Sequence, residues 1–405
     1  MRLLHTSDWH LGQLFYEHER FDEHQAFLAW LLTQLVEQEI DVLLISGDIY
    51  HSANPPTRAE NQFYQFIKSA KAACPELHIV VIAGNHDSAK RITTAKPLLA
   101  QFDTQVVGHF ESQNPENCLI EIEKGQDYVA ILALPYLRAC DILNLKQSYS
   151  ASVKQAYDAI LAAKELPQHA RIVAMGHLHA RGAAVSEDSE RALVIGGEDA
   201  IGADVFPQQA DYVALGHLHK AQSVNGNEYI RYSGTPFAMS FSEKNYKNQC
   251  VIIDLLGENS INVNPLYIPK FKHLHVVPDK GLATLQEVCT QIKALPASDE
   301  SAGYIRVRLS SKEMAPDFRE QIDKALEGKD LLFCGIERVR QELDKTADEL
   351  ELKDLNEIER LDAGRLLEIA INEHPELEAK DVTEEVKALF SKLVSDIEQE
   401  RVDED

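Results

Sequence analysis

The chain has 405 residues, 44% of them apolar, so it exceeds one typical domain and can bury a large core. The formal net charge of −25 at pH 7 argues against a protein that binds nucleic acid through a basic surface alone. Residues 341–405 hold 22 acidic and 8 basic side chains, which places −14 of that charge in this stretch. The sequence shows neither a signal peptide nor an apolar run long enough to span a membrane, and we therefore expect a cytoplasmic protein with no membrane partner.

Five apolar runs of strand type occur within residues 1–219, and each ends in a short motif rich in Asp, Asn or His. In chain order they read RLLHTSDWH, DVLLISGD, HIVVIAGNHD, RIVAMGH and DYVALGH, the last continuing as Leu218-His219. Parallel strands of an open α/β sheet deliver the residues at their carboxyl ends to one edge. The pattern therefore predicts an α/β fold with a functional site at one sheet edge.

The segments between these runs supply the other elements. We expect helices around Phe27–Leu35 and, after Pro55-Pro56-Thr57, around Phe63–Ile67. A hairpin is expected at 118–134, a helix at 151–165, and alternating strands and turns at 222–268.

The sequence changes character after Pro269. Strand patterns at 273–278, 304–310 and 331–340 and helical patterns at 282–292 and 316–326 predict a compact α/β module. Residues 341–405 are acidic and helical in pattern. Five apolar side chains recur there at helical spacing: Val382, Val386, Leu389, Leu393 and Ile397. The pattern alone is equally typical of a helix packed on its own domain and of a solvated tail.

Seven side chains in the motifs could bind metal ions. They are Asp8, His10, Asp48, Asn85, His177, His217 and His219. A single histidine after a strand is usually structural, but five such motifs in order favour a site. Seven oxygen and nitrogen ligands suit two ions that share a carboxylate, and the absence of thiolates favours Mn²⁺, Fe²⁺ or catalytic Zn²⁺. A metal pair about 3.5–4 Å apart can clamp a phosphate, so the set predicts phosphoester chemistry.

The motif order D-x-H, G-D, G-N-H-D, G-H and G-H-x-H resembles the calcineurin-like metallophosphoesterase superfamily. A finer likeness is to the nuclease subunits of SbcCD-type double-strand-break repair complexes. It is carried by MRLLHTSDWHLGQ, SGDIYHSANPP, AGNHDS, YVALGHLHKAQ and YSGTPFAMSF, and its specific motifs lie within residues 1–255. The resemblance implies a two-sheet sandwich with flanking helices at 1–268, a small α/β capping, DNA-binding domain at 269–340 and a helical ATPase-binding segment at 341–405.

The resemblance also implies roles for the site residues. Asp8, His10 and His219 would hold one ion, Asn85, His177 and His217 would hold the other, and Asp48 would bridge them. His86 would contact the phosphate and assist the leaving oxygen, Asp87 would orient His86, and His51 would be a second phosphate-side histidine. GHLH occurs at both 176–179 and 216–219. Chain order favours the second as the two-ligand motif, which leaves His179 without a role.

The implied activity is Mn²⁺-dependent cleavage of DNA by two-metal hydrolysis, as a 3′→5′ exonuclease on duplex ends and an endonuclease on single strands or hairpins. The implied partner is an SMC-like ATPase subunit, SbcC, in DNA repair and recombination. A homodimer is expected, with the exposed faces of 57–72 and 92–102 as its interface. The alternatives are a phosphodiesterase or phosphomonoesterase acting on a small substrate and a non-catalytic scaffold. The cap and tail argue against the first, and the complete ligand set argues against the second.

Overall fold

The structure is a computed structural model that describes residues 1–138, 148–184, 200–257, 260–296, 302–309 and 317–337. The chain divides into two compact units, Met1–Val339 and Arg340–Asp405, and all described residues belong to the first. The helical tail expected at 341–405 therefore lies outside the described residues, as does the end of the strand expected at 331–340.

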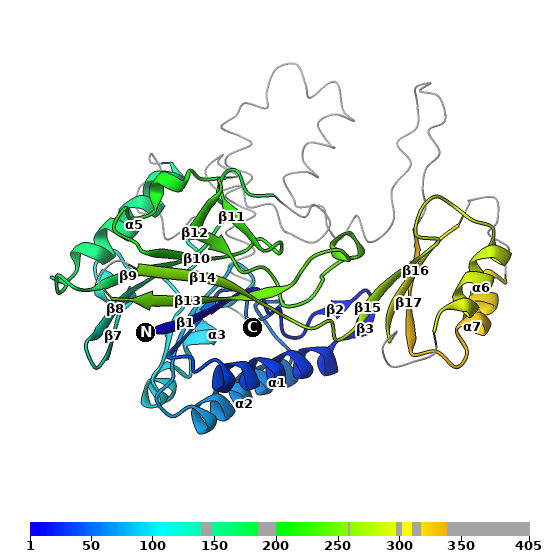
Figure 1. Ribbon diagram of the computed structural model, residues 1–405, viewed down its shortest axis with the longest axis horizontal. Coiled ribbons are helices and arrows are strands. Elements are labelled where there is room, and N and C mark those ends of the chain that lie inside the picture. Colours follow the sequence, from blue (N-terminus) through cyan, green and yellow to red (C-terminus); the bar gives the residue numbers. More distant parts are fainter. Residues whose placement is uncertain (139–147, 185–199, 258–259, 297–301, 310–316, 338–405) are drawn as a thin grey trace, which may run out of the picture. The chain divides into compact units, whose positions relative to one another are not determined.

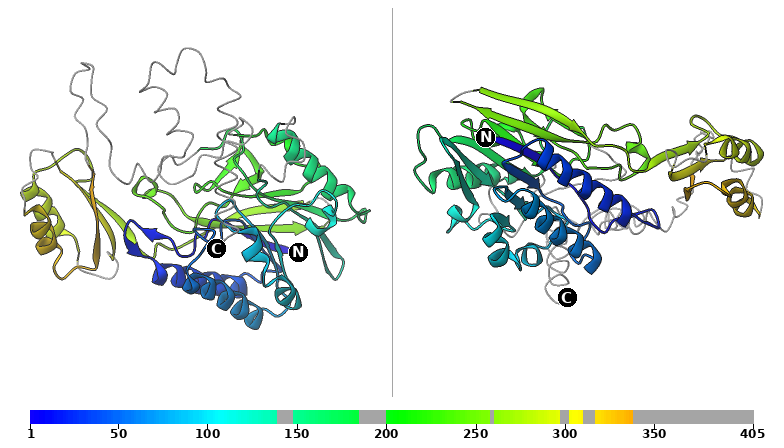
Figure 2. Two further views of the ribbon diagram at one scale, coloured as in Figure 1. Left: turned by 180° about the vertical axis from the view of Figure 1, so that it is seen from behind. Right: turned by 60° about the horizontal axis from the view of Figure 1, so that its bottom comes forward.

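The first sheet has the strand order β14-β13-β1-β4-β5-β6. Its four parallel strands are β1 (Arg2–Thr6), β4 (Val42–Ser46), β5 (His78–Ile82) and β6 (Thr104–Val107). The antiparallel strands β13 (Gln249–Leu256) and β14 (Ser260–Tyr267) extend it beyond β1. Two helices, α1 (Phe21–Glu37) and α2 (Thr57–Ala73), lie side by side along one flank (Figures 1 and 2). They bury Phe27 and Phe63 against Leu43 and Ile45 of the sheet.

The second sheet has the strand order β11-β12-β10-β9-β8-β7. Its strands are β7 (Leu119–Lys124), β8 (Asp127–Ala133), β9 (Arg171–His177), β10 (Tyr212–Gly216), β11 (Gln222–Val224) and β12 (Asn227–Tyr232). Strands β8, β9, β10 and β12 are parallel, and α5 (Tyr149–Ala162) packs on this sheet through Tyr157 and Ile160.

The two sheets share one core. Side chains of a strand alternate between its faces, so Val42 and Leu44 turn away from the helices and join Val173 of the second sheet in one cluster. This confirms the predicted two-sheet sandwich with flanking helices. The expectation that all five motif strands share one sheet edge was wrong, because β1, β4 and β5 belong to the first sheet while β9 and β10 belong to the second. The pattern of apolar residues predicts that a strand is buried, but it does not predict which strand it pairs with.

Short elements fill the connections. They are β2 (Leu14–Phe15), β3 (His18–Glu19), α3 (Ala89–Thr93), α4 (Lys96–Leu99), and the 3₁₀ turns η1 (Ala100–Phe102), η2 (Pro115–Cys118), η4 (Ala203–Val205) and η5 (Phe241–Glu243). The hairpin expected at 118–134 and the helix expected at 151–165 correspond to β7–β8 and α5.

A separate three-stranded parallel sheet follows, with strands β15 (His273–Val277), β16 (Gly303–Arg308) and β17 (Leu331–Glu337). Helices α6 (Leu285–Ala294) and α7 (Phe318–Leu326) pack on it through Val288 and Ile322. We call these elements the β15–β17 module. A capping box between Thr284 and Glu287 begins α6. The elements match those predicted from the sequence of this region.

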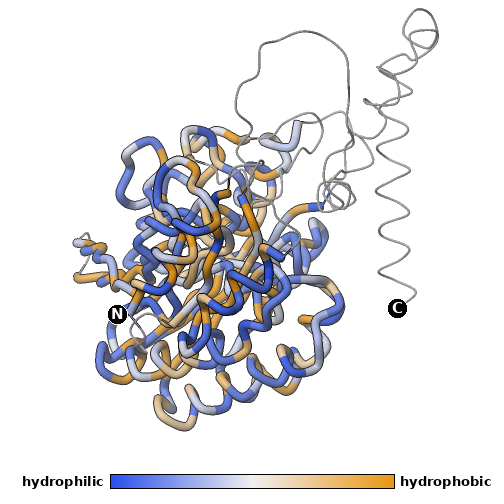
Figure 3. The backbone as a smooth tube through the Cα atoms, turned by 90° about the vertical axis from the view of Figure 1, so that its right-hand side faces the viewer, coloured by the Kyte–Doolittle hydropathy of each residue, from blue (hydrophilic) through white to orange (hydrophobic). Residues whose placement is uncertain are grey.

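Hydrophobic residues gather in the interior of the sandwich (Figure 3). Within the described part of the chain, none of the helices is both long enough and apolar enough to traverse a bilayer.

Candidate metal centre

The loops that follow the five motif strands meet where the two sheets approach each other. The backbone N–H groups of Asp8 and His10 donate to the carbonyls of Gly47 and Asp48, each at 3.0 Å, and so continue the pairing of β1 with β4 beyond the strands. Gly47 carries no side chain at the point where His177 of the other sheet presses against it. A Cβ at position 47 would collide with that imidazole, which explains why the motif begins with glycine.

Four of the predicted ligands have a backbone that favours glycine. The φ angles are 54° at Asp8, 45° at His10, 50° at Asp48 and 103° at His217. A non-glycine residue in this region costs about 1–3 kcal/mol and persists only where the surroundings impose it. The sharp turns bring these side chains back over the ends of their own strands, toward one another.

The Asp48 carboxylate lies at the middle of the centre and is only 2% exposed. Its Oδ2 is 3.6 Å from His10 Nε2 and 3.5 Å from His177 Nε2, which is too long for a hydrogen bond. Two ligand atoms that each lie about 2.0–2.2 Å from a shared ion can be up to about 4.4 Å apart. His10 Nε2 is buried and makes no hydrogen bond to any described residue. These side chains are therefore arranged to hold a cation, and the seven predicted ligands provide only oxygen and nitrogen atoms.

A second part of the centre gathers around Asn85. Its Oδ1 lies 2.9 Å from His177 Nε2 and 3.3 Å from His217 Nδ1. The Nδ1–H of His177 donates to the Ser46 carbonyl at 2.9 Å, which directs Nε2 at Asn85 and Asp48. Burial opposes a charge on His177, yet the nearby Asp48 carboxylate raises the pKa of this imidazole to about 9. The Asp48 carboxylate therefore favours a positive charge at this point of the centre.

The remaining ligand candidates, Asp8 and His219, contact residues in the segment that follows β10. The Asp8 carboxylate accepts from the backbone N–H of His217 at 3.0 Å, and Thr235 Oγ1 donates to the Asp8 carbonyl. Burial raises the pKa of Asp8 to about 6. His219 Nδ1 lies 3.2 Å from Glu243 Oε1, and its ring centroid is 5.3 Å from that of His10. The structure thus brings all seven predicted ligands into one centre, in which Asn85 is half-buried and the other six are buried.

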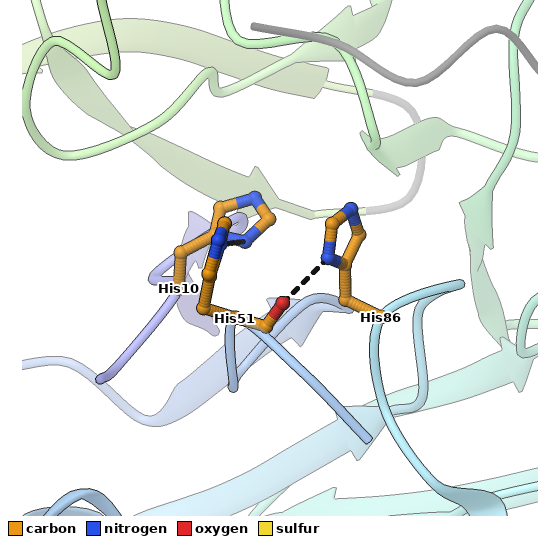
Figure 4. Close-up of side chains that lie close together, drawn as sticks. All are labelled: His10, His51 and His86. Atoms are coloured by element: carbon orange, nitrogen blue, oxygen red, sulfur yellow. Dashed lines mark hydrogen bonds between the residues drawn. The ribbon is translucent and has the colours of Figure 1, made fainter. Parts of the chain in front are cut away.

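Three histidines form a second group at this centre (Figure 4). The Nδ1–H of His86 donates to the His51 carbonyl at 2.7 Å, and the His51 imidazole lies 3.4 Å from His10 between Nδ1 atoms. His86 Nε2 is 4.0 Å from Asp48 Oδ2. His86 therefore points its Nε2 at the predicted ligands, and it is oriented by the backbone of His51.

The predicted role of Asp87 needs correction. Its carboxylate is 1% exposed and accepts three backbone hydrogen bonds, from Gly84 at 2.9 Å, Tyr50 at 3.0 Å and Ile49 at 3.2 Å. The orienting contact of the His86 imidazole is the His51 carbonyl instead. The physical reason is that the chain turns between residues 86 and 87, so Asp87 points into the loop after β4. It ties the loop that carries Asp48 to the loop that carries Asn85.

Three further residues at the centre were missed by the sequence analysis. Glu243 contacts His219, Arg138 donates to the Asp87 carbonyl at 3.1 Å, and the Tyr136 ring lies edge-on to His177. Tyr136 and Arg138 follow β8, whose apolar run ends without an Asp, Asn or His. His179, which had no predicted role, is half-buried and contributes, after burial and His177, to the lowered pKa of His217.

Comparisons with known proteins agree with this geometry. The family model for calcineurin-like phosphoesterases matches residues 1–221, and a second model, described as a type 5 capsule protein repressor C-terminal domain, matches residues 270–374. The chain is 34% identical to SbcD of the nuclease SbcCD from Rhodobacter capsulatus, over 86% of this chain and 89% of the relative. Identity to SbcD of Escherichia coli K12 is 29%, over 88% and 90% of the two chains. Identity to SbcD of Bacillus subtilis 168 is 30%, over 63% and 66%.

The first family model covers more than half of the chain, and the Rhodobacter relative aligns over nearly its whole length. The chain therefore belongs to the calcineurin-like phosphoesterase family and, within it, to the SbcD family of SbcCD nuclease subunits.

Proposed function

We propose that this chain is a metal-dependent nuclease subunit that hydrolyses phosphodiester bonds of DNA with two divalent metal ions. The observation that carries the proposal is the position of Asp48, whose carboxylate faces buried imidazoles at distances that suit a shared cation. Two such ions, when bound, would polarise the phosphate and lower the pKa of a water between them.

Each ion has a candidate set of ligands. Asp8, His10 and His219 would hold one ion, because the His10 and His219 rings are neighbours. Asn85, His177 and His217 would hold the other, because the Asn85 oxygen lies within 3.3 Å of both imidazoles. Asp48 would be shared. Mn²⁺ suits this mixed set of carboxylate, amide and imidazole ligands.

His86 would act on the phosphate. Its Nδ1–H is held by the His51 carbonyl, so the imidazolium form presents its second N–H, at Nε2, toward the centre. That group can donate a hydrogen bond to a phosphate oxygen and then a proton to the leaving oxygen. The side chain of His51 lies beside it, with ring centroids 5.5 Å apart, and would contact the same phosphate.

The finer assignments are those that the resemblance of the motifs implies. The proposed activities are 3′→5′ exonuclease on duplex ends and endonuclease on single strands and hairpins, with SbcC as the ATPase partner. Residues 1–268 would be the nuclease domain, 269–340 the capping domain and 341–405 the partner-binding segment, with the complex in the cytoplasm. A homodimer is supported by Leu98 and Phe102, which are 59% and 47% exposed within the segment 92–102.

The decisive experiment is cleavage of end-labelled duplex and hairpin DNA by the purified chain in Mn²⁺, Mg²⁺ or EDTA, alongside His86→Ala. We expect the variant to keep its metals, because the Asp48 carboxylate accepts from the backbone N–H of His86 and not from its ring. Turnover should fall about 10²–10⁴-fold, the usual contribution of a positioned acid. His78→Ala is the matched control, because His78 begins β5 at the end opposite to Asn85.

Two outcomes would contradict the proposal in different ways. Loss of metal from His86→Ala would show that its role is wrong. Hydrolysis of a small phosphodiester without cleavage of DNA, in any metal and with SbcC added, would show that DNA is not the substrate.

A further inference from the structure

Glu243 lies directly behind His219 and has a buried carboxylate, 1% exposed. Its Oε1 is 3.2 Å from His219 Nδ1, and its Oε2 accepts from the backbone N–H of Met239 at 2.7 Å. Because a carboxylate only accepts, the ring must donate from Nδ1, which leaves the lone pair of Nε2 for a metal ion. A carboxylate in this position fixes the tautomer of a metal-binding histidine and increases its basicity.

The turn that carries Glu243 has a second contact at its other end. Phe241, 5% exposed, belongs to the same single turn η5 and joins a cluster with Phe15, Val276, Tyr304 and Cys334. Its ring centroid is 5.3 Å from that of Phe15, and the Phe15 and Tyr304 centroids are 4.4 Å apart. Three of the five cluster members come from the β15–β17 module. The guanidinium of Arg306, on β16 of the module, also lies over the Phe241 ring, 5.9 Å from its centroid. One turn therefore contacts both a candidate ligand and the module.

A neutral residue could accept from the Met239 N–H equally well, so this contact does not explain a buried charge. Burying a carboxylate is costly unless it is compensated. The imidazole of His219 provides that compensation, and it gains strength as a metal ligand in return. The contact with His219 thus gives a carboxylate at this position a role in the metal centre.

We propose that Glu243 is a positioning residue for His219, and that η5 links the packing of the β15–β17 module to metal affinity at the His219 site. The inference rests on the proposed function, since it requires His219 to bind a metal ion. The link is short: a displacement of Phe241 by about 1 Å would carry the Glu243–His219 contact beyond hydrogen-bond distance. Movement of the module would then change the metal affinity of the His219 site and leave the metal affinity of the Asn85 site unchanged.

The first test is a titration of the metal-free full chain with Mn²⁺, in which binding is measured by calorimetry and by the electron paramagnetic resonance signal of free Mn²⁺. We expect Glu243→Ala to bind one of two ions about 10–100-fold more weakly, with Glu243→Gln intermediate because it keeps an acceptor. Ser242→Ala changes an exposed neighbour on the same turn and should bind as the unaltered chain does. The midpoint of thermal unfolding in EDTA separates loss of affinity from loss of fold.

The results distinguish the inference from the proposed function. If the unaltered chain binds no Mn²⁺, the proposed function fails. If it binds two ions and Glu243→Ala binds both equally well, the positioning role is overturned while the nuclease centre stands.

The second test addresses the link. Phe241→Leu keeps an apolar side chain but loses the aromatic packing, and we expect weaker binding of the same ion that Glu243→Ala affects. Ser242→Ala is again the control, because Ser242 is exposed on the same turn and lies outside the Phe241 cluster. Metal affinity in Phe241→Leu equal to that of Ser242→Ala would overturn the link.

Discussion

Removing the Asp87 carboxylate tests whether this residue holds two loops of the centre together. The variant Asp87→Ala leaves three buried backbone N–H groups, of Ile49, Tyr50 and Gly84, without their acceptor. The first two N–H groups follow Asp48 and the third precedes Asn85, so both loops lose hydrogen bonds that hold them in place. We expect lower stability and weaker metal binding, even though Asp87 itself is not a ligand.

The magnitude follows from the number of donors. Each buried donor that loses its partner costs about 1–3 kcal/mol, and water entering the vacated space recovers part of this, so we expect a loss of about 3–5 kcal/mol. Burial and the nearby Asp48 charge raise the pKa of Asp87 to about 7. Asp87→Ala therefore also removes the repulsion between the Asp87 and Asp48 carboxylates, and in the metal-free protein this offsets part of the loss of stability. Bound metal ions would cancel that repulsion, so the loss should be larger in Mn²⁺ than in EDTA.

Urea unfolding monitored by tryptophan fluorescence measures the effect, because Trp9 is buried in the core beside the first sheet and Trp30, on α1, packs against that core. Asp87→Asn keeps one oxygen, which can serve Gly84 and Ile49, and should lose only about 1–3 kcal/mol. Asp158→Ala removes an exposed pair with Lys154 on α5 and should cost at most about 1 kcal/mol. A loss below about 1 kcal/mol for Asp87→Ala in both Mn²⁺ and EDTA would refute the bracing role.

Four further predictions concern metal, catalysis and pH. Asp48→Ala should abolish binding of both ions in calorimetry, because it removes the shared carboxylate. His51→Ala should keep both ions and lose less single-turnover activity than His86→Ala, because the carbonyl that orients His86 is retained. Mn²⁺ at 100 times its dissociation constant should stabilise the chain by about 2.7 kcal/mol for each bound ion, and EDTA should reverse this in thermal unfolding. Burial lowers the pKa of His5 from 6.5 to about 3, so the folded chain holds this imidazole in its neutral form. Below pH 6.5 the unfolded chain binds a proton here that the folded chain does not bind. The free energy of unfolding should therefore fall on acidification, by about 2 kcal/mol at pH 5. Between pH 7 and pH 5 the urea midpoint of His5→Gln should therefore fall less than that of the unaltered chain. An equal fall in both would contradict this prediction.

The strands and ligand candidates could be predicted from the sequence because both leave local patterns. Buried runs such as 42–45 contain only apolar residues and end directly before the motif segment, here Ser46-Gly47-Asp48, so the end of the strand and the start of the site nearly coincide in the sequence. Assignment of β9 and β10 to a second sheet could not be predicted, because strand pairing depends on contacts between residues far apart in the chain.

The supporting contacts were predicted less well than the ligands. Glu243 lies 24 residues from His219, in a polar turn that has no distinctive pattern. Asp87 follows His86 directly, and adjacency suggested a contact that the backbone direction prevents. Which atoms a side chain contacts depends on the φ and ψ angles of its loop, and the motifs do not encode these angles.

The left-handed residues support a functional centre independently of the family. At Asp8, His10, Asp48 and His217 a glycine would relieve the backbone, yet each position carries a side chain that can bind a metal. The hydrogen bonds from Asp8 and His10 to the loop after β4 compensate part of the strain of about 1–3 kcal/mol per residue, and the rest remains as a cost to stability. A chain under selection for stability alone would place glycine there. The strained Asp and His residues are best explained by the ions that they would hold.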